Sequence, residues 1–231
     1  MRRIIVFSLL IIPAICLSFL NSCNSGSVLK VYSGKTFSDE VYKDGAQAIP
    51  GRIQCEYYDF GGESIAYHES DSVNSGSGNY NLADGTYLNE FRINESVDIS
   101  YTKSGDIDDN SFNMVDPEMN QLYIGWTNPG EWTKYTVDVK SSGRYRIGIM
   151  YTAHDNGKIS ISINDKDITG PLEIPSTFVL EDTLDWRQWH HWNYLDNIAE
   201  VDLEKGLQTL SLFTVETGQM NYDYLEFSII K

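Results

Sequence analysis

Cysteine is scarce in this sequence. The chain has 231 residues and three cysteines, Cys16, Cys23 and Cys55, and the first two lie in or directly after an apolar N-terminal run. The body of the chain therefore contains one thiol, which cannot form an internal disulfide or, without a cysteine cluster, a zinc site. Cys55 alternates with polar neighbours as in a strand, so we interpret it as a small buried hydrophobe rather than as a catalytic thiol.

Positive charge is scarce as well. The chain has 17 lysines and arginines against 33 aspartates and glutamates, which gives a formal net charge of −16. An acidic surface without a basic stripe repels phosphate backbones, so this composition excludes nucleic acid as a partner. Clustered carboxylates are, in contrast, natural ligands for a hard cation such as calcium.

Long hydrophobic runs are absent except at the N-terminus. Two arginines precede an apolar run over residues 4–20, and the small residues that follow end at Cys23. This pattern is typical of a secretory signal peptide. The ending Leu-Asn-Ser-Cys23 resembles the lipobox of bacterial lipoproteins, in which the cysteine becomes the lipidated first residue; an ordinary signal peptide or a membrane anchor is the alternative. We predict a signal peptide over residues 1–22 and a protein anchored through lipidated Cys23 at the outer membrane of the cell envelope.

Helical periodicity is also missing after residue 50. Apolar residues instead alternate with polar ones over 145–151 and 159–163, and turn residues such as Asn164 and Asp165 separate these stretches. Many short strands with turn signals between them predict an all-β chain folded as a β-sandwich. Further strands are expected over residues 54–58, 97–99, 186–194, 201–203, 207–213 and 222–229.

Three regions follow from composition. Residues 23–48 mix Ser, Gly, Lys and Asp and read as a tether with one weak strand over 28–32. The domain is expected over residues 49–231, with a long Gly- and Ser-rich loop region over 61–85. Residues 104–120 contain five acidic residues and almost no periodicity. We expect this stretch to be a surface insertion, and loops of this length are usually functional or disordered.

A turn near the middle of the chain carries a prominent aromatic residue. The stretch Asn128-Pro-Gly130 has turn chemistry, and residues 136–139 alternate as a strand does. One strand should therefore end near Trp126 and the next begin near Glu131. This leaves Trp126 at the mouth of a turn on a sheet edge, where a large exposed ring suggests a binding site.

Other aromatic and polar residues stand at unusual positions. Trp186, Trp189 and Trp192 recur every third residue, so a strand would place the first and last on one face and the middle one on the other. At least one ring must then be exposed; we expect this of Trp186, which lies nearest a polar loop, and expect Trp189 to be buried. Asn221 and Asp223 interrupt an apolar strand, where unpaired polar groups would cost about 1–3 kcal/mol, so both should have partners.

Several of these residues occur together in one known family. From Ile49 to the C-terminus the chain contains, in this order, Ile49-Pro-Gly51, Ile53-Gln-Cys-Glu-Tyr-Tyr-Asp59, Ala66-Tyr-His68, Ile124-Gly-Trp126, Gly130-Glu-Trp-Thr-Lys-Tyr135, Pro175-Ser-Thr177, Trp186–Trp189 and Met220-Asn-Tyr-Asp-Tyr224. This ordered set resembles family 6 carbohydrate-binding modules, in particular the subgroup attached to agarases and β-glucanases. The chain departs from the family at Cys55, where alanine is usual, and in the insertion 104–120.

The resemblance implies a sandwich of the jelly-roll, galactose-binding-like type with its principal site in the loops at one end. There Trp126 and Trp186 would flank a sugar, and Asn221 would hydrogen-bond its hydroxyls. The chemistry is suitable because a pyranose presents C–H groups on its faces and hydroxyls around its rim.

The resemblance also implies a structural calcium ion. Its ligands would be Gln54, Glu56 and Asp223, with backbone carbonyls or water completing the shell. Oxygen-only ligation is what calcium prefers. Gln54 and Glu56 are two residues apart and would share one face of a strand.

Catalysis finds little support in the sequence. Glycoside hydrolysis usually needs two carboxylates across the scissile bond, and no compact motif supplies such a pair. His190 and His191 are adjacent and would point apart on a strand, and no serine lies in a nucleophile-elbow setting. We expect a monomeric, non-catalytic binder of polysaccharide or oligosaccharide. A sandwich-fold glycoside hydrolase or lyase, and an envelope module that binds another protein, are the alternatives.

Overall fold

The computed structural model describes residues 32–216 and 218–230. The predicted signal peptide, Cys23 and the first part of the predicted tether, with most of its weak strand, lie outside the described residues. Within the described part of the chain, no helix has the length and hydrophobicity needed to cross a membrane.

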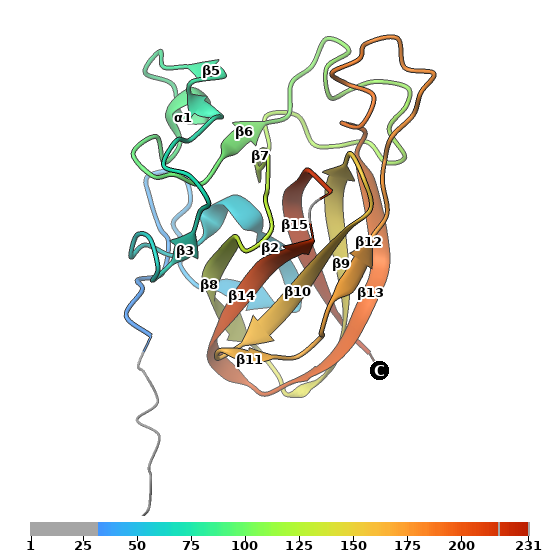
Figure 1. The fold of residues 1–231 in the computed structure, drawn as a ribbon. Coiled ribbons are helices and arrows are strands. Elements are labelled where there is room, and N and C mark those ends of the chain that lie inside the picture. Colours follow the sequence, from blue (N-terminus) through green and yellow to red (C-terminus); the bar gives the residue numbers. More distant parts are fainter. Residues whose placement is uncertain (1–31, 217, 231) are drawn as a thin grey trace, which may run out of the picture. The chain divides into compact units, whose positions relative to one another are not determined.

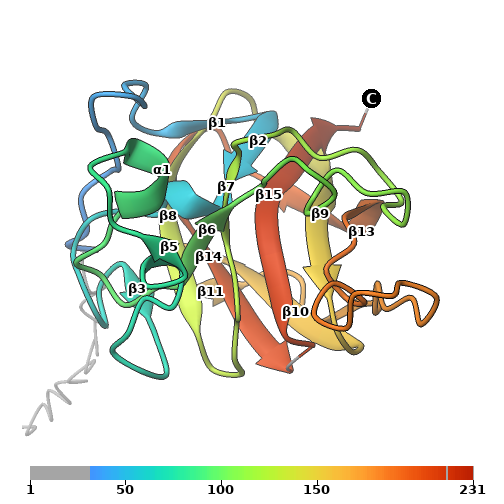
Figure 2. The same ribbon diagram turned by 90° about the horizontal axis from the view of Figure 1, so that it is seen from above.

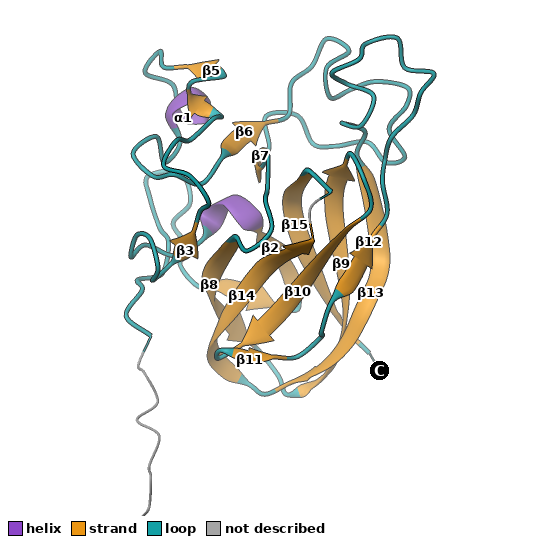
Figure 3. Cartoon of the chain, in the orientation of Figure 1, coloured by secondary structure: helices purple, strands orange, loops and turns teal. Residues whose placement is uncertain are grey.

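Two β-sheets make up most of the domain (Figures 1 and 3). The strands of the first sheet are β1 (Gln47–Ile49), β3 (Tyr67–His68), β8 (Trp132–Val139), β10 (Gly157–Ile163), β11 (Lys166–Asp167), β12 (Leu172–Ile174) and β14 (Gly206–Glu216). Those of the second are β2 (Gly51–Gln54), β6 (Ile99–Tyr101), β7 (Leu122–Ile124), β9 (Gly143–Ala153), β13 (Asn193–Leu203) and β15 (Met220–Ile229). A 3-10 helix, η1 (Cys55–Tyr57), a short helix, α1 (Tyr87–Glu90), and the pair β4 (Ser77–Gly78) and β5 (Asn81–Leu82) complete the fold.

The pairing is antiparallel except at the edges. The first sheet has the order β1-β8-β14-β10-β11, with β3 against β8 and β12 against β10. The second has the order β13-β9-β15-β7-β6, with β2 against β15. The pair β1–β8 is parallel, as is β4–β5. The all-β sandwich predicted from the sequence is therefore confirmed.

The core lies where the predicted alternation puts it. In β8 every second side chain is buried, from Thr133 to Val139. Ile159 and Ile161 of β10 and Ile147 of β9 are fully buried in the same cluster. The Asn164-Asp165 turn has positive φ at both residues, 51° and 62°, as the tight hairpin between β10 and β11 requires.

Two predicted strands were wrong. Residues 186–192 form a turn and a loop, and strand β13 begins only at Asn193. The turn is closed by the Arg187 N–H, which donates to the Leu184 carbonyl, so the argument that placed three tryptophans on strand faces does not hold. In the expected strand 54–58, pairing with β15 stops at Gln54 and η1 follows, so Glu56 does not share a strand face with Gln54.

Residues 32–48 fold onto the domain instead of forming a free tether. Phe37 is only 2% exposed and belongs to the main core. Lys35 and Phe60 exchange both backbone hydrogen bonds, at 2.7 and 2.6 Å, and β1 pairs with β8. The folded domain thus includes these residues as well as 49–230.

Candidate functional site

One end of the sandwich carries a pocket of about 390 Å³. The loop over 103–121 and the loop over 175–192 lie at this end (Figures 1 and 2) and are joined by hydrogen bonds. Both loops contribute residues to the pocket lining. The lining residues are Tyr80, Lys103, Ile107, Asp108, Tyr123, Trp126, Trp186, Trp189, His190 and Asn221. The structure therefore brings Trp126, Trp186 and Asn221, which are far apart in sequence, around a single pocket.

Trp126 stands on the turn that connects β7 in one sheet with β8 in the other. Its backbone is left-handed, with φ 51°, and its N–H donates to Asn221 Oδ1 at 3.1 Å. The indole is half-buried and meets the ring of Tyr80 edge-on, with the ring centroids 6.0 Å apart. The backbone of this residue is thus fixed by a buried side chain, while part of its ring faces the pocket.

Trp186 is 50% exposed, although the residues at its base are held firmly. The next residue, Arg187, pairs with both oxygens of buried Asp182, at 2.6 and 2.9 Å. Hydrogen bonds from Arg187 and then His191 hold the pKa of Asp182 well below its usual value, although burial opposes this. A buried ion pair therefore anchors the turn that presents the exposed indole.

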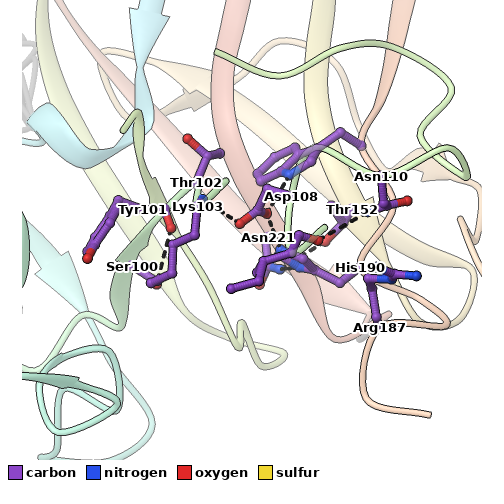
Figure 4. Close-up of polar contacts among 12 residues, drawn as sticks. Ser100, Tyr101, Thr102, Lys103, Asp108, Asn110, Thr152, Arg187, His190 and Asn221 are labelled. Carbon is purple, nitrogen blue, oxygen red and sulfur yellow. Dashed lines mark hydrogen bonds and ion pairs between the residues drawn. The ribbon is translucent and has the colours of Figure 1, made fainter. Parts of the chain in front are cut away.

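Asn221 has most of its hydrogen-bonding capacity occupied by the protein (Figure 4). It is 2% exposed, and its Nδ2 donates to Thr152 Oγ1 at 2.8 Å and to His190 Nδ1 at 2.9 Å. Because Oδ1 already accepts from Trp126, one lone pair on that oxygen is left. Toward a ligand, Asn221 can act as an acceptor, and its other role is to position Trp126 and His190.

The pocket wall includes residues that the sequence did not indicate. His190 Nδ1 accepts from Asn221, so its proton is on Nε2, which donates to Asp108 Oδ1 at 2.6 Å. Trp192 Nε1 donates to the same oxygen at 2.9 Å, and the Lys103 N–H donates to Asp108 Oδ2 at 2.7 Å. Burial would raise the pKa of Asp108, but the hydrogen bonds from His190 and Trp192 lower it overall.

The insertion 104–120 is therefore not only surface. Asp108 is 1% exposed and ties this segment to residues more than 80 positions later in the chain. The side chain of Asn113 accepts from the Trp192 N–H at 3.0 Å, and Arg187 donates to the Asp106 carbonyl. The acidic composition suggested a solvated loop because the partners of Asp108 cannot be identified from sequence spacing.

The remaining tryptophans of the 186–192 stretch differ in exposure. Trp192 is fully buried against Tyr123, with their ring centroids 5.2 Å apart. Trp189, expected to be buried, is half-buried and lines the pocket. Tyr80, from the Gly- and Ser-rich loop, was also missed; an aromatic residue in a polar loop was the only signal available for it.

A second group of carboxylates lies at η1 and β15. Glu56 is fully buried and Asp223 is 2% exposed, in a bulge between Tyr222 and Tyr224. Gln121 Nε2 donates to Glu56 Oε1 at 3.1 Å and to the side-chain oxygen of Gln54 at 3.4 Å. Burial and the negative charge of Asp223 raise the pKa of Glu56 well above its usual value, and burial raises that of Asp223 to about 8.

These carboxylates fit a hard cation. Glu56 Oε2 and Asp223 Oδ1 are buried without a hydrogen-bond partner. Uncompensated buried charge of this kind is strongly destabilising, and oxygen atoms alone are suitable ligands for calcium. The described residues contain no group of three or more His, Cys, Asp or Glu placed to hold a metal. Gln54, backbone carbonyls or water must therefore complete any such shell.

The pocket is poorly equipped for glycoside hydrolysis. Its lining contains one carboxylate, Asp108, whose oxygens already accept three N–H donors. Hydrolysis usually requires a second carboxylate across the scissile bond. The geometry favours holding a ligand over cleaving it.

Comparison with known proteins gives one family. Residues 98–229, more than half of the chain, match the carbohydrate binding module (family 6) model. No curated protein sequence matches the chain. The resemblance to this family is thereby confirmed, whereas the agarase- and β-glucanase-associated subgroup remains a prediction.

Solved structures of the same type resemble the chain at low identity. A family 6 module of Clostridium stercorarium, in complex with cellobiose, is 14% identical with a TM-score of 0.47, covering 81% of this chain and 99% of that one. A β-1,3-glucan-binding module of Bacillus halodurans is 17% identical with a TM-score of 0.45, covering 79% and 98%. The C-terminal module of a marine laminarinase from Zobellia galactanivorans is 21% identical with a TM-score of 0.38, covering 47% and 81%.

Proposed function

The chain belongs to family 6 of the carbohydrate-binding modules, and on this premise we propose that its pocket holds a sugar ring between Trp126 and Trp186. Family 6 modules bind carbohydrate without catalysis. We extend this to the whole chain, which we propose to be a binder and not an enzyme.

One observation carries the proposal: two indoles from distant loops converge on one pocket beside a buried amide. Aromatic faces suit the C–H groups of a pyranose, and the free lone pair of Asn221 Oδ1 suits a hydroxyl. The anchoring of Trp126 by Asn221 and of the Trp186 turn by Asp182 means that the site exists before ligand arrives. Preorganisation of this kind lowers the entropy lost on binding.

A calcium ion is a further part of the proposal. Gln54, Glu56 and Asp223 would hold it, since two of these side chains carry the unpartnered buried oxygens. When bound, the ion would neutralise two buried carboxylates. The chain's own contribution is to keep these oxygens together through Gln121 and the β15 bulge.

The N-terminal sequence supports a proposal for the location of the protein. The lipobox-like ending at Cys23 supports a lipid-anchored protein of the outer membrane. We propose that the module holds polysaccharide or oligosaccharide at the cell envelope as a monomer.

The test is affinity electrophoresis on laminarin, xylan, agarose and mixed-linkage glucan, run with a reducing-sugar assay. We expect retarded migration without sugar release. Trp126→Ala and Trp186→Ala should each weaken binding by about 2 kcal/mol or more, roughly 30-fold. The melting temperature of Trp186→Ala should stay nearly unchanged because half of that side chain is exposed.

Trp132→Ala is the matched control, because this tryptophan lies on β8 and does not line the pocket. Release of sugar would favour a glycoside hydrolase or lyase instead. Failure to bind any member of a broad glycan panel would favour a module whose partner is another protein.

A further inference from the structure

Among the described residues, Lys103 is the one lysine or arginine that lines the pocket. It is half-buried, and its ammonium forms no ion pair with any described residue. Every other buried or half-buried lysine or arginine, within the part of the chain that the structure describes, has a carboxylate partner: Arg92, Lys134, Arg146, Lys158 and Arg187. In a chain of net charge −16, an unpaired cation at a ligand pocket is unexpected.

The contacts of the Lys103 ammonium are all neutral (Figure 4). Nζ donates to Ser100 Oγ at 3.2 Å and to the Tyr101 carbonyl at 3.1 Å. It also lies over two rings, 4.0 Å from the centroid of Tyr101 and 5.2 Å from that of Tyr80. An ammonium group has three donors, so these contacts orient it and leave one N–H for a ligand.

Asp108 does not serve as the counter-ion. It is 1% exposed, and its oxygens accept from His190, Trp192 and the backbone N–H of Lys103. Burial lowers the pKa of the Lys103 ammonium, and the charge of Asp108 opposes this only in part. The pocket therefore contains a partly desolvated positive charge whose compensation within the protein is incomplete.

We infer that the pocket takes a sugar bearing an anionic group, the carboxylate of a uronic acid or a sulfate ester, with the Lys103 ammonium as its counter-ion. This inference rests on the proposed carbohydrate binding and specifies its ligand class. The aromatic rings of Trp126 and Trp186 would hold the sugar faces, and Lys103 would select for charge at the rim. A hydrogen bond between charged groups discriminates more strongly than one to a hydroxyl.

The test uses matched ligands. Methyl glycosides of glucose, galactose and mannose are each titrated as the neutral sugar, the uronate and the 6-sulfate, with binding followed by calorimetry or ligand-observed NMR. For at least one sugar the charged form should bind roughly 10- to 100-fold more tightly than its neutral parent. The uronate and sulfate arms show which anion is preferred. Added salt should reduce the preference, because screening weakens the charge interaction.

Variants assign the preference to the residue. Lys103→Met, which retains the packing of the stem, should reduce affinity for the charged form to that for the neutral parent. Lys103→Arg should keep most of the preference. Lys205→Met removes the same charge from an exposed position outside the pocket and should behave as wild type.

Three results would contradict the inference, and they are distinguishable. If charged and neutral forms bind equally, and binding is still lost in Trp126→Ala, the ligand class is wrong while carbohydrate binding stands. If no member of the panel binds, both proposals fail. A charge preference that survives in Lys103→Met would also contradict the assignment.

Discussion

Asp108 and Asp223 are both buried carboxylates of one sandwich, and the protein surrounds them differently. Asp108 accepts three N–H donors, and its pKa is lowered by hydrogen bonds despite its burial. Asp223 has an oxygen with no partner, and its pKa is raised to about 8 by burial. Glu56 shares this second condition.

The difference lies in whether the fold itself supplies hydrogen-bond partners for the carboxylate oxygens. Asp108 is satisfied within the fold, and it joins the insertion to His190 and Trp192, so it is a structural part of the pocket. Glu56 and Asp223 are not satisfied, which is why we propose a cation for them and none for Asp108. The two regions should respond in opposite ways to mutation, chelation and acid.

The largest expected effect is from removing the satisfied carboxylate. Asp108→Ala leaves buried donors on His190, Trp192 and Lys103 without an acceptor, so we expect a loss of about 3 kcal/mol or more in the free energy of unfolding. Urea unfolding measures it. Asp116→Ala, at an exposed position of the same insertion, is the control and should change stability by less than about 0.5 kcal/mol. A loss below about 1 kcal/mol for Asp108→Ala would contradict the structural role that we assign to Asp108 in the pocket wall.

A smaller effect is expected from chelation. If Glu56 and Asp223 bind calcium, excess calcium should stabilise the protein by about 3 kcal/mol at 100 times its dissociation constant. Chelator should therefore lower the melting temperature by roughly 5–10 °C. Scanning calorimetry measures both.

Asp223→Asn should remove this sensitivity and, without calcium, be at least as stable as wild type, because it removes a buried carboxyl group whose Oδ1 has no hydrogen-bond partner to stabilise the ionised form. Asp202→Asn, exposed on β13, should keep the full response to calcium. A wild-type protein indifferent to chelator would end the calcium proposal.

The smallest effect over a single pH unit is a pH dependence of stability, which has opposite sign in the two regions. Without calcium, the pKa of Asp223 is about 8 in the folded protein and near 4 when unfolded. The folded state then binds a proton that the unfolded state releases, so stability falls as pH rises through this window, by at most ~1.4 kcal/mol per pH unit. The pKa of Asp108 is lowered from its usual value, so the stability that ionised Asp108 contributes is lost only in more acidic solution.

Comparing wild type with Asp223→Asn between pH 5 and 8 measures the titration of Asp223 together with its effect on Glu56, whose pKa the charge of Asp223 helps to raise. Glu69 and Asp98 also have raised pKa values, about 10 and about 6, with burial as the largest cause. Both groups are present in each protein, so their contributions cancel. Parallel stability curves for the two proteins would show that Asp223 does not titrate in this range.

The parts of the fold that could be predicted are those that repeat locally. The alternating residues of β8, β9 and β10 indicate their strands because burial on one face has a period of two. The spacing of three tryptophans over 186–192 has no such period. The strand predicted there is wrong because the ion pair between Arg187 and Asp182 stabilises a turn.

The candidate site was predictable only where one residue type suggests its chemistry. Trp126 stood out as a large ring beside a turn, and Asn221 as an amide in an apolar strand. Asp108 and His190 gave no such signal, because their role depends on a contact across 82 positions. Lys103 gave none because its neighbours Ser100 and Tyr101 do not by themselves indicate a pocket. The packing of Phe37 onto the domain was missed for the same reason, since one phenylalanine in a polar segment has no period.

The left-handed backbone of Trp126 has a kinetic consequence. A φ of 51° is disfavoured for a bulky residue by roughly 1–3 kcal/mol. It persists here because Asn221 Oδ1 accepts a hydrogen bond from the N–H of Trp126 itself. The free-energy cost of this conformation is thus incurred during folding and not again each time that a sugar binds. Exchange on and off the pocket should be rapid, so lasting retention of a polymer would depend on many simultaneous contacts instead of one long-lived one.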